Sequence, residues 1–117
     1  MIKLRSEDLE KAVIEIREKG EKLAKSEATY EYLKSMIKVR KAELILENAN
    51  NGMTYKDREC MAESHSDITQ MHKNIRMSKE EVIKLRHQID SIKESCNLFR
   101  TESANERGEK KLYGELG

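Results

Sequence analysis

The feature that most constrains this chain is the return of an apolar side chain every seven residues on both sides of a short interruption. Two turns of a helix take about seven residues, so a repeat of this length lines one helical face. The first series is Leu9, Ile16, Leu23, Tyr30, Ile37 and Leu44. The second pairs Ile68, Ile75, Val82, Ile89 and Cys96 (heptad a) with Met71, Ser78, Leu85, Ile92 and Phe99 (heptad d). The pattern predicts two long helices, and the chain has no proline to break them.

The interruption, residues 47–60, reads ENANNGMTYKDREC. We expect the first helix to end among Asn48, Asn50, Asn51 and Gly52, because Asn and Gly tolerate left-handed backbone conformations. Thr54, with Asp57 three residues later, has the spacing of a helix start. A helix from there to about residue 63 is too short to be stable alone. We therefore expect it to fold back on the first helix. The expected contact joins Met53, Tyr55, Cys60 and Met61 to Met36, Val39, Ile45 and Leu46.

These observations predict an all-α fold: an antiparallel, coiled-coil-like hairpin of two long helices with a short capping helix at its tip. The expected boundaries within a single domain of 117 residues are 6–48, 54–63 and 66–107, followed by a frayed tail, 108–117, that contains Gly108 and Gly114. Ser6 and Ser66 are the expected N-caps of the long helices.

The first helix has a weaker seam than the second. Its heptad d positions are Ala12, Lys19, Ser26, Leu33, Arg40 and Glu47, half of them charged. Near the tip, in contrast, apolar residues occupy more than one face of this helix. A lone hairpin would leave such residues exposed, so we expect a homo-oligomer.

Composition and charge narrow the function classes. The chain is 37% hydrophobic and 38% charged, which fits long helices with narrow apolar seams better than an enzyme scaffold. A net charge of +1 gives no global attraction to nucleic acid or membranes. No apolar run approaches the ~20 residues needed to span a bilayer, and the start lacks a signal-peptide core. Cys60 and Cys96 suit free thiols in a reducing compartment, so we expect a soluble, cytoplasmic protein.

No residue pattern indicates catalysis. His65, His72 and His87 are separated by seven and fifteen positions, not by the three or four that place two metal ligands on adjacent turns. There is no glycine-rich phosphate loop and no nucleophile elbow. We therefore expect no catalytic, cofactor or metal site and no small-molecule substrate.

One charge pattern stands out on the second long helix. The residue after each heptad d position is basic, and we call this set the basic stripe: His72, Lys79, Arg86, Lys93, Arg100 and Arg107. In an antiparallel hairpin, Lys34, Lys38 and Lys41 of the first helix are expected to lie near its start. Like charges held together are mildly unfavourable unless something acidic binds. The stripe is thus either a solvated flank that sets helix orientation or a surface for phosphates or an acidic protein.

Three segments resemble small helical accessory proteins of tailed bacteriophages. They are SEATYEYLK (residues 26–34), TYKDRECMAESH (54–65) and NLFRTESANER (97–107). Where that group often has Trp-Arg, this chain has Phe99-Arg100. Such proteins are commonly encoded near recombination genes, so the resemblance implies a non-catalytic role in DNA metabolism within an infected bacterial host. It also implies that Phe99, Arg100 and Arg107 are candidates for a shared surface.

Three functions remain open at this point. The leading hypothesis is an accessory protein that binds a protein or nucleic-acid partner, DNA in particular, during recombination or replication. The second is an anti-defence inhibitor that blocks a host nuclease or CRISPR complex, although the net charge of +1 argues against acidic DNA mimicry. The third is a purely structural coiled coil.

Overall fold

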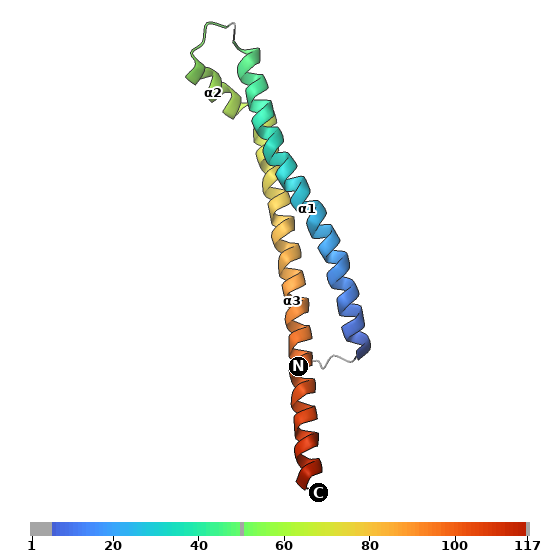
Figure 1. Cartoon of the computed structure of the whole chain (residues 1–117). Coiled ribbons are helices and arrows are strands. Elements are labelled where there is room, and N and C mark those ends of the chain that lie inside the picture. The colour runs from blue at the N-terminus through green and yellow to red at the C-terminus, as the bar shows by residue number, and fades with distance from the viewer. Residues whose placement is uncertain (1–5, 50, 117) are drawn as a thin grey trace. The chain divides into compact units, whose positions relative to one another are not determined.

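The computed structural model describes the backbone of residues 6–49 and 51–116 and the side chains of residues 7–49 and 51–108. The expected cap Ser6 and the interruption residue Asn50 lie outside the described side chains. The chain contains α1 (Ser6–Glu47), α2 (Tyr55–Ser64) and α3 (Ser66–Leu116), with no strand in the described ranges (Figure 1). This confirms the predicted all-α fold, a hairpin of two long helices, α1 and α3, with the short helix α2 between them.

The core of the segment 23–84 lies where its three helices meet. Ile37 and Leu44 of α1, Ala62 of α2 and Ile68 of α3 are buried together, and Ile68 is 0% exposed. Ile45, Met71 and Ile75 pack against this cluster. Most of these residues occupy the predicted heptad a and d positions, so the heptad pattern identifies the buried face of both long helices.

The described residues outside this segment, 6–22 and 85–116, belong to a second compact unit. Its buried side chains among the described residues are Leu85, Ile89 and Cys96, again at heptad a and d of α3. On the α1 side, Leu9, Ala12 and Ile16 are half-buried. This unit therefore has a narrower apolar core than the segment 23–84.

The interruption folds as its sequence predicts. Gly52 has a φ of 68°, a left-handed conformation that glycine adopts at little cost. The Asn48 side chain donates from Nδ2 to the Leu44 carbonyl oxygen at 2.9 Å, which satisfies an acceptor near the end of α1. The Thr54 hydroxyl accepts from the Asp57 N–H at 3.2 Å, so Thr54 is the N-cap of α2 as predicted.

The predicted contact of α2 with the first helix is wrong for most of the residues that were expected to form it. Tyr55 and Met61 are 58% and 44% exposed, and Cys60 is exposed as well. Ala62 is the buried residue of this helix, at 2% exposure, and its small side chain permits a close approach to the core. A helix this short can bury only one narrow face. The junction with α3 at His65 determines which residues of α2 lie on that face. Val39 and Leu46 consequently stay exposed.

Both ends of α3 also differ from expectation. His65 rather than Ser66 caps its start: the ring Nδ1 accepts from the Asp67 N–H at 3.1 Å, and the carbonyl oxygen accepts from the Thr69 N–H at 3.1 Å. At the other end the helix continues through Gly108 to Leu116 instead of stopping near residue 107. A helical glycine costs about 1 kcal/mol but keeps its N–H, so Gly108 and Gly114, separated by five other residues, do not end the helix.

Candidate binding surface

The basic stripe lies on the exposed side of α3. His72 and Lys79 belong to the segment 23–84, whereas Arg86, Lys93, Arg100 and Arg107 belong to the other unit. All six side chains are exposed. Their cationic groups repeat along one face of the helix about every 10 Å, because seven residues rise ~1.5 Å each.

The members of the basic stripe differ in whether other groups of the chain neutralise their positive charge. Within the described residues, Lys79, Lys93 and Arg100 form no ion pair. Arg86 interacts with another group of the chain, and the Arg107 Nε donates to the Ser103 carbonyl oxygen at 3.3 Å. Three cations of the stripe are therefore available to an anionic ligand without breaking an internal ion pair.

An acidic side chain of α2 occupies part of the expected basic cluster at the tip. The Lys41 Nζ lies 2.6 Å from the Glu63 Oε1. The hydrogen bond from Lys41 lowers the pKa of the Glu63 carboxyl below its usual value, and the charges of Lys41 and His72 add to this effect. Lys41 and His72 thus both act on a carboxylate that belongs to the same chain. The role of Glu63 could not be found from the sequence pattern, because its position depends on how α2 folds back.

The other two lysines of α1 do not join this cluster. The Lys34 Nζ lies 5.0 Å from the centre of the Tyr30 ring and 3.8 Å from the Glu31 Oε1, so its partners come from its own helix. Lys38 is exposed and forms no ion pair with another described residue. The three predicted lysines therefore have three different environments.

An open groove separates the end of α1 from α2 within the segment 23–84. Its volume is about 630 Å³, and residues that line it include Lys41, Ile45, Lys56, Cys60, Ala62 and Glu63. The ion pair between Lys41 and Glu63 crosses this groove and neutralises two of its charges. The groove therefore offers neither a concentrated positive charge for phosphates nor a closed apolar pocket.

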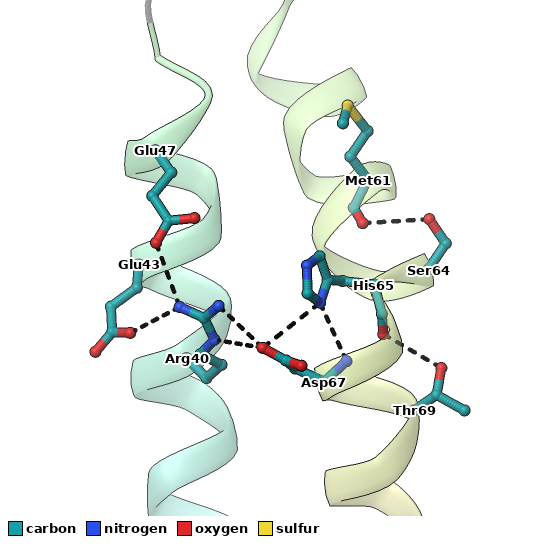
Figure 2. A network of polar contacts seen from close by, with 8 residues as sticks. All are labelled: Arg40, Glu43, Glu47, Met61, Ser64, His65, Asp67 and Thr69. Atoms are coloured by element: carbon teal, nitrogen blue, oxygen red, sulfur yellow. Dashed lines mark hydrogen bonds and ion pairs between the residues drawn. The ribbon is translucent and has the colours of Figure 1, made fainter.

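The polar heptad d residues of α1 make contacts across the hairpin. Arg40 donates from Nη2 and Nε to the Asp67 Oδ2 of α3, at 2.9 and 3.2 Å (Figure 2). Its Nη1 also lies 3.0 Å from Glu43 and 3.3 Å from Glu47. The hydrogen bond to Asp67 raises the pKa of Arg40 most, and the hydrogen bond to Glu43 raises it further. This network neutralises the guanidinium internally, which indicates a structural role.

Lys19 makes the equivalent contact in the other unit. Its Nζ donates to the Gln88 Oε1 at 3.0 Å and lies 3.8 Å from the Glu15 Oε1. Lys19 and Arg40 are both at heptad d of α1, and Gln88 and Asp67 are both directly before a heptad a residue of α3. Two of the polar residues in the first seam thus form cross-hairpin hydrogen bonds, and such bonds favour one register over others.

The described residues contain neither a cluster of metal ligands nor a helix that could cross a membrane. No group of three or more His, Cys, Asp or Glu side chains among them is arranged to hold a metal ion. Within the same residues, no helix has an apolar stretch of the length and hydropathy that membrane crossing needs.

Comparison with protein-family models, curated proteins and solved structures finds no match for this chain.

Proposed function

We propose that the protein is a non-catalytic accessory protein that binds nucleic acid through the basic stripe of α3. The observation that carries this proposal is the exposure of Lys79, Lys93 and Arg100, which form no ion pair with other described residues. Four other cations, Lys19, Lys34, Arg40 and Lys41, are in contrast partly neutralised by carboxylates of the chain. The contrast leaves the stripe as a local excess of positive charge on a chain whose net charge is only +1.

The resemblance to phage accessory proteins supports a place for this binding in DNA recombination or replication. The stripe consists of one histidine and five lysine or arginine residues with few aromatic residues nearby, and such a surface contacts phosphates rather than base edges. Binding should therefore depend little on sequence. Anti-defence inhibition of a nuclease and a purely structural role are the two alternatives that the test below separates from nucleic-acid binding.

The test compares two variants that change the same amount of charge. The stripe variant is K79E/K93E/R100E, and the control is K11E/K22E/K25E, which reverses three exposed lysines of α1. Each variant lowers the formal net charge by six. Fluorescence anisotropy with labelled single- and double-stranded DNA should show that the wild-type protein binds. The dissociation constant of the stripe variant should rise at least tenfold more than that of the control.

The salt dependence provides a second measurement. For three phosphate contacts, raising the salt from about 50 to about 200 mM should weaken wild-type binding roughly 20- to 40-fold through counterion release. No wild-type binding at the lower salt, or an equal loss in both variants, would overturn the proposal. In that case, recovery of a nuclease complex with the wild-type protein from an infected host would favour the inhibitor, and recovery of no partner would favour the structural role.

A further inference from the structure

A second apolar seam runs along α1 on the side away from the hairpin. Its members, which we call the outer seam, are Ala28, Tyr32, Ser35, Val39, Ala42 and Leu46. They are spaced alternately by four and three residues, the interval that lines one face of a helix. At ~100° per residue, this face lies roughly 160° around the helix from the seam of Ile37 and Leu44. The outer seam is therefore a second packing surface on the same helix.

The outer seam is uncovered in the single chain. Tyr32, Val39 and Leu46 are 62%, 47% and 73% exposed, and the three small members are also exposed. Isolated apolar side chains are common on protein surfaces, but a contiguous row at heptad spacing marks an interaction site. Apolar heptad rows of this kind are usually covered by another helix.

The order of side-chain sizes along the outer seam indicates which helix fits. Large residues (Tyr32, Val39, Leu46) alternate strictly with small ones (Ala28, Ser35, Ala42). A parallel second copy would set large against large and small against small, leaving clashes and gaps. An antiparallel copy sets every large residue against a small one. The layers are then Leu46 with the second copy's Ala28, Val39 with its Ser35, and Tyr32 with its Ala42.

We propose that the outer seam binds the outer seam of a second copy of this chain in antiparallel orientation. The arrangement is a two-fold interface in which the same patch is used twice, as is common in homodimers. A face of 18 residue steps is about 27 Å long and ~10 Å wide, or roughly 300 Å² of contact per copy. This is smaller than the ~800 Å² per partner of a standard interface, so the dimer should be weak and should dissociate on dilution.

The first test is sedimentation equilibrium from about 1 to about 200 μM with a matched pair of variants. Val39 and Val13 are both in α1 and both 47% exposed, but only Val39 belongs to the outer seam. V39E should raise the dimer dissociation constant at least tenfold, whereas V13E should leave it within about twofold of the wild type. Circular dichroism should show the same helicity for all three proteins. A monomeric wild type throughout this range, or equal effects of the two variants, would overturn the proposal.

The second test determines orientation by disulfide trapping. In a C60A/C96A background, one chain carries A28C and another carries L46C. An antiparallel dimer places these two positions opposite each other, so a disulfide should form when the chains are mixed and not in either chain alone. A parallel dimer would instead cross-link each chain with itself. Cross-linking of the separate chains, or none in the mixture, would contradict the antiparallel arrangement.

Discussion

Replacing Ile68 by alanine should reveal how much of the stability comes from the point where the three helices meet. Ile68 is 0% exposed and contacts the cluster that joins α1, α2 and α3. Truncating a buried isoleucine to alanine costs ~2–5 kcal/mol, because transfer free energy is lost and a cavity remains. Alanine recovers a few tenths of a kcal/mol through its higher helix propensity. The expected net loss is about 3 kcal/mol.

Ile83→Ala is the matched control for this substitution. Ile83 is in the same helix but 43% exposed, so the same atoms are removed with little loss of buried contact. The gain in helix propensity is similar at both positions. We therefore expect Ile83→Ala to change the free energy of unfolding by less than ~1 kcal/mol.

Urea unfolding followed by circular dichroism at 222 nm would measure both changes. A loss of about 3 kcal/mol corresponds to roughly 12 °C in Tm for a chain of this size. The wild type and both variants should give similar m-values, which would show that the extent of unfolding is unchanged. If Ile68→Ala cost no more than Ile83→Ala, the burial of Ile68 between three helices would be refuted.

Two further predictions concern single sites. Gly20→Ala should stabilise the protein by about 0.5–1 kcal/mol, because the residue is helical and an added Cβ would meet nothing within 4 Å; a lower Tm would show that the site has no room. The hydrogen bond from Lys41 holds the folded-state pKa of Glu63 below the ordinary value of 4.5, so its carboxylate adds stability above about pH 4.5 that is lost as the pH falls through the folded value. The stability difference between wild type and Glu63→Gln should therefore shrink on acidification from pH 7 to pH 3, and a difference independent of pH would contradict the ion pair with Lys41.

The polar residues in the first seam show how far a heptad pattern can be read. Lys19 and Arg40 look like defects in a one-dimensional pattern because they replace apolar residues at heptad d. In the hairpin they donate to Gln88 and Asp67 across the two long helices. A periodicity argument ranks residues by hydrophobicity, and it does not reveal that a long cationic side chain can reach an acceptor on the facing helix.

The sequence by itself determined the helices, the buried faces of the two long helices and the turn. Periodicity of seven identifies the buried stripe because helical geometry is local, and Gly52 and Thr54 act through their own backbone neighbours. The basic stripe was predictable for the same reason, since its members share one helix.

Only the tertiary structure decided which residues of α2 are buried and which charges are neutralised. Ala62 became the buried residue of α2, and Glu63 took the place beside Lys41 that the sequence analysis had left to a partner. Both outcomes depend on the angle at which α2 leaves the His65 junction. That angle is set by packing among residues far apart in the chain, and a pattern read along one helix at a time contains no information about it.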